Sequence, residues 1–148
     1  HDRPLNGRGR RAAQDIAGIL ADMAPPPTIV LCSTARRTRE TLDGIRPGLA
    51  GDPEVRFERR LYLADADVLA AAVRDLPDVP AALLIGHNPG LHELACHLAG
   101  TGDPALRTRL AQHFPTGALA MIAFPGAWAA AVAGTGRLVS YLVPRDLD

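Results

Sequence analysis

A cluster of arginines follows a short apolar run near position 30. The run Thr28–Cys32 predicts a buried strand, and the segment after it holds three arginines within four positions, Arg36, Arg37 and Arg39. A guanidinium at the end of such a strand can grip a phosphate through two parallel hydrogen bonds, beside the free amides of a helix N-terminus. On a helix, Arg37 shares a face with Thr41 and the other two arginines point elsewhere. Composition alone favours a simpler interpretation, an exposed and arginine-rich helix start.

A histidine lies at a second strand-to-helix junction. The apolar run Ala81–Gly86 predicts another buried strand, and His87, Asn88 and Pro89 come directly after it. An imidazole in this position can hydrogen-bond an anion above the sheet, and Pro89 suits the first turn of a helix. A lone histidine is nevertheless a weak signal, because structural histidines are common. The segment is not a nucleophile elbow, because no serine occupies its apex.

The spacing of the histidines argues against a metal site. His87, His92 and His97 recur every five residues. Steps of five turn a helix by about 140°, so the three rings do not converge on one ion. The run that starts at His92 is not H-E-x-x-H either, because Cys96 stands where the second histidine should be. We therefore expect neither a metal nor another cofactor.

Strands and helices are expected to alternate through the first two thirds of the chain. The hydrophobic patterns predict five helices. The first covers about Asn6–Met23 with Asn6 as N-cap, and the second runs from Ser33 as N-cap to the Pro47–Gly48 breaker. The third begins at Asp65 or Asp67, the fourth follows His87, and the fifth ends at His113. They predict strands over Thr28–Cys32, Val55–Leu61, Ala81–Gly86, Ala118–Phe124, Trp128–Ala133 and Leu138–Val143, the last two paired across Gly134–Gly136, with Gly100–Pro104 as a loop.

This alternation predicts a three-layer α/β/α fold with a mostly parallel central sheet, formed by residues 1–148 as a single domain. In such folds ligands bind beyond the carboxyl ends of the strands. That rule selects two segments as the candidate site, Ser33–Arg37 and His87–Gly90.

The composition excludes several classes of protein. Apolar residues make up 47% of the chain, and 16 arginines balance 16 acidic residues, so no net charge points to nucleic acid or to an anionic membrane. No apolar stretch reaches the roughly 20 residues of a membrane span. Cys32 and Cys96 lie in apolar runs without CxxC spacing, which predicts buried free thiols in a reducing cytoplasm.

Six segments, in order, give the chain a family resemblance. Together they resemble the SixA-like phosphohistidine phosphatases, a branch of the histidine phosphatase superfamily with a phosphoglycerate mutase-like fold. The matching segments are Asp2–Leu5 followed by Gly9, Ser33–Thr41 as an S-x-x-x-R-x-x-x-T motif, Leu61–Ala64, Ile85–Gly90, Phe114–Ala118 and Leu138–Arg145. Each segment is a weak signal, but six in the right order are a strong one.

The resemblance implies a metal-independent phosphatase that acts on phosphohistidine in a protein. A histidine attacks phosphorus and becomes phosphorylated, and water then hydrolyses this intermediate. Surrounding cations stabilise the phosphoryl oxygens in transit. The resemblance assigns Arg37 and His87 as catalytic residues, and Arg37, His87 and Asn88 as phosphate-binding residues. A phosphorylated protein, a small phosphorylated substrate, or phosphate itself would occupy this pocket.

The family's nucleophile belongs to an Arg-His-Gly or Arg-His-Ala motif on an N-terminal strand. That strand precedes the segment that Asp2–Leu5 resembles, so we expect the motif upstream of His1, on a central strand that residues 1–148 lack. The alternative is a catalytically inactive form that binds phosphorylated partners through Arg37 and His87.

The position of Leu63 bears on the leaving group. Many superfamily members that cleave phosphate monoesters carry an acid here, which protonates the departing alkoxide. Leucine at this position favours phosphohistidine, whose imidazole leaves more readily. Glu58 and Asp65 are close enough in sequence to supply an acid, so a small-molecule phosphomonoesterase stays open as an alternative.

Overall fold

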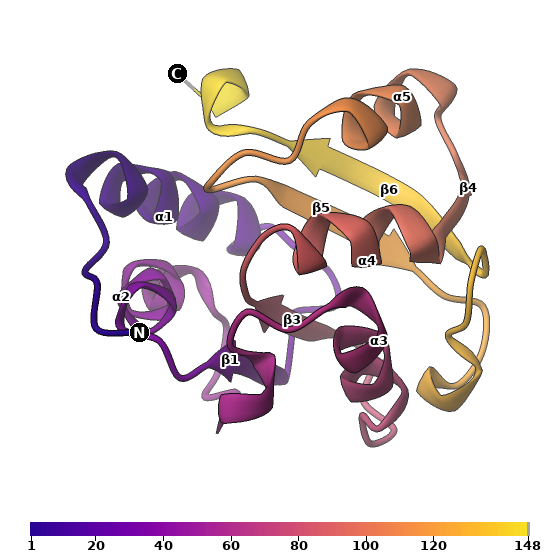
Figure 1. Cartoon of the computed structure of the whole chain (residues 1–148), viewed down its shortest axis with the longest axis horizontal. Coiled ribbons are helices and arrows are strands. Elements are labelled where there is room, and N and C mark those ends of the chain that lie inside the picture. Colours follow the sequence, from indigo (N-terminus) through magenta and orange to yellow (C-terminus); the bar gives the residue numbers. More distant parts are fainter. Residues whose placement is uncertain (148) are drawn as a thin grey trace. The chain divides into compact units, whose positions relative to one another are not determined.

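The computed structural model describes residues 1–147 (Figure 1), and it divides into two compact units. Unit 1 comprises His1–Tyr62 and Val79–Gly86, and unit 2 comprises Leu63–Asp78 and His87–Asp148. Each unit contains a three-stranded sheet, and three of the four strand pairings described are parallel. The predicted α/β class with mostly parallel strands is confirmed, whereas the single domain stays a prediction.

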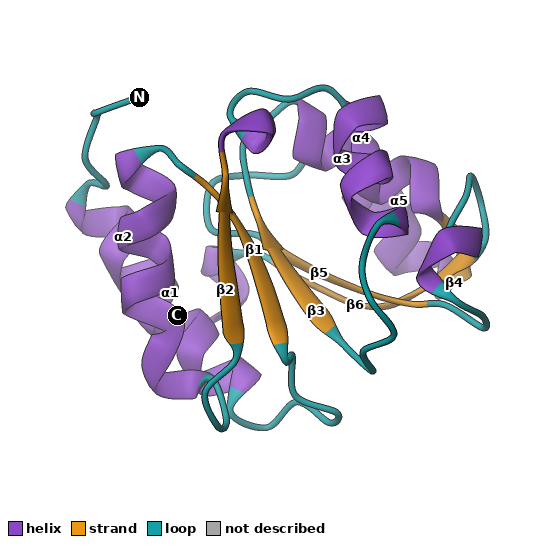
Figure 2. Ribbon diagram, turned by 90° about the horizontal axis from the view of Figure 1, so that it is seen from below, coloured by secondary structure: helices purple, strands orange, loops and turns teal. Residues whose placement is uncertain are grey.

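Strand β1 (Ile29–Ser33) is the central strand of unit 1. It pairs in parallel with β2 (Glu54–Glu58) on one edge and with β3 (Ala82–Ile85) on the other, and Figure 2 shows the three strands side by side. All five residues of β1 are buried, which explains why its sequence is continuously apolar rather than alternating. In this register Cys32 lies beside Ile85, so β1 and β3 end next to each other.

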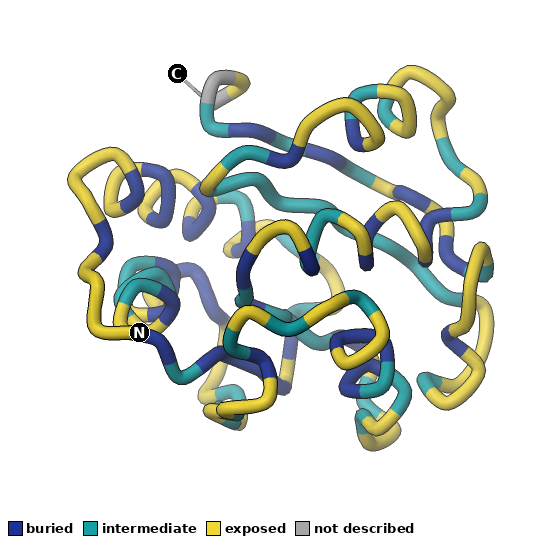
Figure 3. The backbone as a smooth tube through the Cα atoms, in the orientation of Figure 1, coloured by how far each residue is buried: buried dark blue, intermediate teal, exposed yellow. Residues whose placement is uncertain are grey.

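Two helices cover this sheet's face in unit 1. Helix α2 (Arg36–Ile45) packs on β1 and β3, and helix α1 (Gly7–Leu20) packs on α2. The predicted N-cap is confirmed, because the Asn6 side chain accepts a hydrogen bond from the Gly9 amide at 2.8 Å. Figure 3 shows buried and exposed residues alternating along α1, as expected for a helix with one face in the core.

The segment after α2 touches α1 at very short range. It forms a 3₁₀ helix, η1 (Arg46–Gly48), whose last residue packs on the α1 backbone. A Cβ atom on Gly48 would lie 1.9 Å from the carbonyl oxygen of Ala17. Only glycine permits this approach.

Unit 2 combines three helices with a mixed sheet. Its elements are α3 (Ala66–Arg74), α4 (Gly90–Leu98), β4 (Ala99–Gly102), α5 (Pro104–Gln112), β5 (Leu119–Ala123) and β6 (Gly136–Leu142). The strand order is β4-β6-β5, with β4 parallel and β5 antiparallel to β6. Its core is built from residues of α4, α5 and β6 together with Phe114.

Several sequence predictions are wrong in unit 2. The predicted strand Trp128–Ala133 is not a strand, because Trp128–Ala130 forms a 3₁₀ helix, η3, and β6 pairs with β5 instead. The predicted loop from Gly100 contains strand β4, which its glycines hide from sequence analysis. Among residues 1–147, no helix is both long and apolar enough to cross a membrane.

The close contact at Gly48 leads to a stability prediction. Replacing Gly48 with alanine should lower the free energy of unfolding by about 2 kcal/mol or more, because backbone atoms must separate to admit the methyl group. Gly18→Ala is the matched control, since Gly18 lies in α1 and a methyl group added there would have nothing within 4 Å. Alanine there should raise stability by up to about 1 kcal/mol. Urea denaturation of both variants measures these changes, and an undisturbed Gly48→Ala protein would contradict the packing.

Candidate functional site

Buried hydroxyl groups shape the turn between β1 and α2. The Thr38 hydroxyl lies 2.9 Å from the Ser33 carbonyl and 2.8 Å from the Ala35 carbonyl, and both Ser33 and Thr38 are buried. The helix begins at Arg36 with Ala35 as its N-cap, so the predicted capping role of Ser33 is wrong. The Ser33 hydroxyl instead accepts a hydrogen bond from the Ala35 amide at 3.4 Å. These bonds fix the direction in which α2 leaves the sheet.

Different partners hold two of the three arginines of this helix. Glu40 binds Arg36 at 3.2 Å through an i,i+4 ion pair. Arg39 donates from Nε to the Thr34 carbonyl at 2.9 Å, and its guanidinium lies 4.6 Å from the centre of the Phe57 ring. Both side chains are thereby directed along the surface of unit 1.

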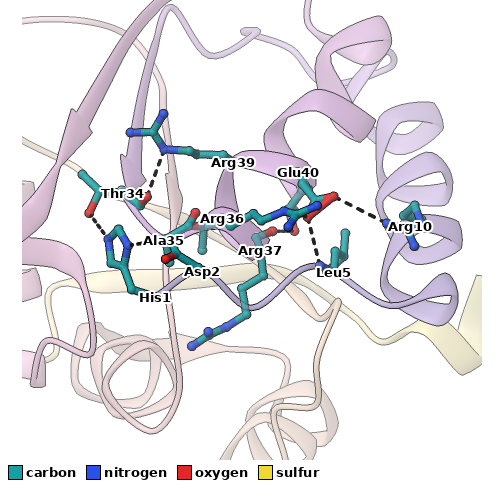
Figure 4. Close-up of polar contacts among 12 residues, drawn as sticks. His1, Asp2, Leu5, Arg10, Thr34, Ala35, Arg36, Arg37, Arg39 and Glu40 are labelled. Carbon is teal, nitrogen blue, oxygen red and sulfur yellow. Dashed lines mark hydrogen bonds and ion pairs between the residues drawn. The ribbon is translucent and has the colours of Figure 1, made fainter.

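Arg37 follows a different course. Its side chain is half-buried, and Figure 4 shows it extending away from Glu40 and from Thr34. The Thr41 hydroxyl donates to the Arg37 carbonyl at 2.9 Å and so lies on the same helical face, as the spacing predicts. The S-x-x-x-R-x-x-x-T motif singles out this arginine, whose side chain takes a different direction from those of Arg36 and Arg39.

The first residues of the chain are tied to the start of α2. The His1 ring lies 2.9 Å from the Thr34 hydroxyl, and the His1 carbonyl accepts the Arg36 amide at 2.9 Å. Further along, the Leu5 amide donates to Glu40 at 3.1 Å. Figure 4 draws the contact of His1 with Thr34 and that of Leu5 with Glu40. Glu40 thus links the N-terminal loop to the arginine-bearing helix, a contact between residues 35 positions apart that no local pattern in the sequence indicates.

His87 lies in the loop directly before helix α4, in unit 2. It is buried, with 7% of its surface exposed, and its carbonyl accepts the Leu91 amide at 2.9 Å in the first turn. Three residues later, a Cβ atom on Gly90 would lie 1.9 Å from the Ala64 carbonyl oxygen. The loop from His87 to Gly90 therefore packs backbone to backbone against the segment before α3.

Asn88 connects this loop to a distant part of unit 2. Its side-chain amide donates to the Phe114 carbonyl at 2.7 Å. The structure thus places His87 and Asn88 on one loop in unit 2, and Arg37 on α2 in unit 1. The sequence did not indicate Phe114 as a partner of Asn88, because no local signal relates residues that are 26 positions apart.

The two carboxylates near Leu63 already have structural partners. Glu58 is paired with Arg60 at 2.8 Å, and Asp65 caps α3 by accepting the Val68 amide at 3.0 Å. Leu63 itself is 58% exposed and has a φ of +50°, a left-handed conformation that is uncommon for leucine. An acid for a leaving group is therefore absent from position 63, and its two neighbours serve the fold.

The two cysteines differ, and only one matches the prediction. Cys32 is fully buried in β1, and burial raises the pKa of its thiol to about 11. Cys96 is exposed, so its predicted burial is wrong, and partial burial of its thiol raises that pKa as well. Among the described residues, no group of three or more His, Cys, Asp or Glu side chains could hold a metal ion.

Comparisons with known proteins place the chain among relatives and solved structures. No protein-family model matches it. An uncharacterised protein of Mycobacterium tuberculosis is 37% identical over 98% of this chain and 91% of its own length. A solved structure from Nakamurella multipartitia, assigned as a SixA phosphohistidine phosphatase, is 31% identical, with a TM-score of 0.85 over 97% of this chain and 86% of that one.

Two further solved structures resemble the chain. One from Agrobacterium tumefaciens, also assigned as a SixA phosphohistidine phosphatase, is 27% identical, with a TM-score of 0.79 over 97% of this chain and 84% of that one. A structure of the protein histidine phosphatase SixA complexed with tungstate has a TM-score of 0.78 over 99% of this chain and 88% of that one. At 22% identity, this last likeness shows the fold alone.

The contrast between the thiols predicts their reactivity. With a pKa of about 11, about one Cys32 thiol in a thousand is ionised at pH 8, and the strand shields it from reagent. Ellman's reagent should therefore label one thiol in the native protein and a second only after unfolding. Cys96→Ser should abolish the native reaction, whereas Cys32→Ser should leave it intact. Equal labelling of both thiols in the native state would contradict the burial of Cys32.

Proposed function

Since this chain belongs to the SixA phosphohistidine phosphatases of the histidine phosphatase superfamily, we propose that it removes phosphate from a phosphohistidine in a protein. The family membership supports a phosphatase. The protein substrate, the covalent intermediate and the roles of individual residues are our proposals.

The register of β1 and β3 is the observation that carries the proposal. Cys32 and Ile85 are neighbours in adjacent parallel strands. The two segments selected from the sequence therefore leave the sheet of unit 1 from neighbouring strand ends, where α/β proteins bind their ligands. Ser33 begins the segment that bears Arg37, and Gly86 precedes His87.

The proposed reaction has two steps. A histidine in an Arg-His motif upstream of His1 attacks phosphorus, so that a new N–P bond forms while the N–P bond of the substrate breaks. The substrate imidazole leaves and takes up a proton. Water then attacks the phosphorylated enzyme and releases inorganic phosphate together with the regenerated nucleophile. No step requires a metal.

Arg37 and His87 would stabilise charge on the moving phosphoryl group. The Arg37 guanidinium offers a planar fork that matches two phosphate oxygens, and a ring N–H of His87 would donate to a third. We also propose Asn88 as a phosphate-binding residue, since its amide carries two N–H donors and the bond to Phe114 needs only one of them. Tungstate, the oxyanion bound in the SixA structure, is a suitable probe of this site.

The carboxylates around Leu63 support phosphohistidine over an alkyl phosphate. An alkoxide leaving group needs a proton donor, and Glu58 and Asp65 are engaged by Arg60 and by the Val68 amide. An imidazole leaves without a dedicated acid. This favours the protein substrate over a small phosphate monoester.

The roles of the arginines can be tested by paired substitutions in the full-length protein. Arg37→Lys should lower kcat/KM for a phosphohistidine protein by about 10²-fold, because lysine cannot reproduce the bidentate contact in the transition state. Arg36→Lys, the matched control, should stay within about twofold, since Arg36 is part of an exposed ion pair. Tungstate affinity, measured by calorimetry, should fall in the first variant only. Equal effects in both would refute the assignment of Arg37.

Substrate preference is tested by introducing an acid at position 63. The wild-type protein should hydrolyse a phosphohistidine protein at least about 100-fold more efficiently than glycerol phosphate. Leu63→Asp should raise kcat/KM for glycerol phosphate by about tenfold or more, and Leu63→Asn, which has the same shape but no proton to give, should not. A wild-type preference for glycerol phosphate would favour the small-molecule phosphomonoesterase. Absence of turnover with intact tungstate binding would indicate the inactive phosphate-binding form.

A further inference from the structure

The bond between Asn88 and Phe114 assigns Asn88 a second role, which rests on the proposed function. We propose that Asn88 is a positioning residue: it fixes the backbone of the His87 loop, and thereby the orientation in which the His87 imidazole meets the phosphoryl group. Two features of unit 2 support this role, the burial and stacking of the acceptor residue Phe114 and the position of Asn88 directly after His87.

The acceptor belongs to a residue that is itself immobilised. Phe114 is buried, and its ring stacks between two others, with centroids 5.7 Å from His92 and 5.8 Å from Tyr141 and interplanar angles of 13° and 14°. The Phe114 carbonyl is therefore a fixed point.

Helix α4 and the loop before it contact Phe114 at two places. Asn88 binds the Phe114 carbonyl, and His92, four residues later, stacks on the Phe114 ring. On another side, Gly90 packs against the Ala64 carbonyl. The segment from His87 to His92 is thus held by side chains and backbone at three positions. Of these three positions, Asn88 is the nearest to His87 in the sequence, and it lies before α4, so a substitution there leaves the residues of the helix unchanged.

The amide side chain of Asn88 is suited to holding the loop in place. Its carboxamide donates to a carbonyl, a bond that neither an ionised aspartate nor an alanine side chain can form. The bond is partly buried, so its loss leaves a carbonyl without its partner in a region with limited access to water. The neighbouring His87 loop would then sample more than one backbone arrangement.

The test uses Asn88→Ala and Asn88→Asp in the full-length protein, with Tyr141→Phe as the matched control. The control removes one hydrogen bond from the same segment, to the His113 carbonyl, but keeps the stacked ring and leaves Asn88 untouched. The first readout is amide hydrogen exchange without any phosphate or tungstate. Exchange at Leu91, whose amide donates to the His87 carbonyl, measures local opening of the loop. Exchange at Leu98, at the other end of α4, measures global opening.

We expect exchange at Leu91 to accelerate at least about tenfold more than exchange at Leu98 in both Asn88 variants, and equally at both sites in Tyr141→Phe. The second readout is the phosphatase reaction. In Asn88→Ala, kcat should fall by about 10-fold to 100-fold while KM changes by no more than about threefold, because a misoriented His87 weakens the transition state rather than binding.

Unchanged exchange at Leu91 in the Asn88 variants would overturn the proposal, even with a loss of activity, since Asn88 would then be a phosphate ligand only. Faster exchange with an unaltered kcat would overturn it too. A wild-type protein without turnover would refute the proposed function instead. The exchange at Leu91 would then decide the positioning role by itself, because it needs no catalysis.

Discussion

Parallel pairing along both edges of β1 is the constraint on which unit 1 depends. Because β1 has a neighbour on either side and helix α2 on its face, its five residues are buried and its backbone groups are committed to β2 and β3. A strand cannot shift in register by one residue without moving every side chain to the opposite face. The end of β1 is therefore fixed relative to the end of β3. The position of the turn that begins at Ser33 is fixed with it. The arginine that follows starts from a defined place for the same reason.

Side-chain contacts give the three arginines of α2 different orientations. Three guanidinium groups within four residues repel one another and compete for the same anions. Glu40 and the Thr34 carbonyl resolve this competition by holding Arg36 and Arg39 along the surface. The simpler interpretation of such a cluster, a solvated helix face, thus describes two of the three side chains well. Electrostatic sorting of this kind requires no buried charge, and it costs little because each pair stays in contact with water.

Local signals in the sequence account for much of the fold. Asn6 and Asp65 were predictable as caps because a short polar side chain before an apolar helical pattern has few other uses. The central strand was predictable from its unbroken apolar run. Strand β4 was not, because Gly100 and Gly102 carry no hydrophobic pattern and the strand is defined by its pairing with the distant β6. The candidate site, with Arg37 and His87, was selected by residue type and by position at strand ends, and it stays a prediction. Two hydrogen bonds that hold the surrounding segments, Leu5 to Glu40 and Asn88 to Phe114, could not be predicted. They join residues 35 and 26 positions apart, and no local sequence pattern indicates them.

The backbone of Leu63 has a consequence for how this protein could diverge. A leucine with a φ of +50° carries a conformational cost of about 1 kcal/mol that aspartate and asparagine largely avoid. New enzymatic specificities usually arise at the expense of stability, because the substituted residue fits its site less well. Here the polar residue fits the backbone better than the residue it replaces. A descendant with an acid at this position would therefore gain new chemistry and a more relaxed loop in one mutational step, along a path without the usual trade-off.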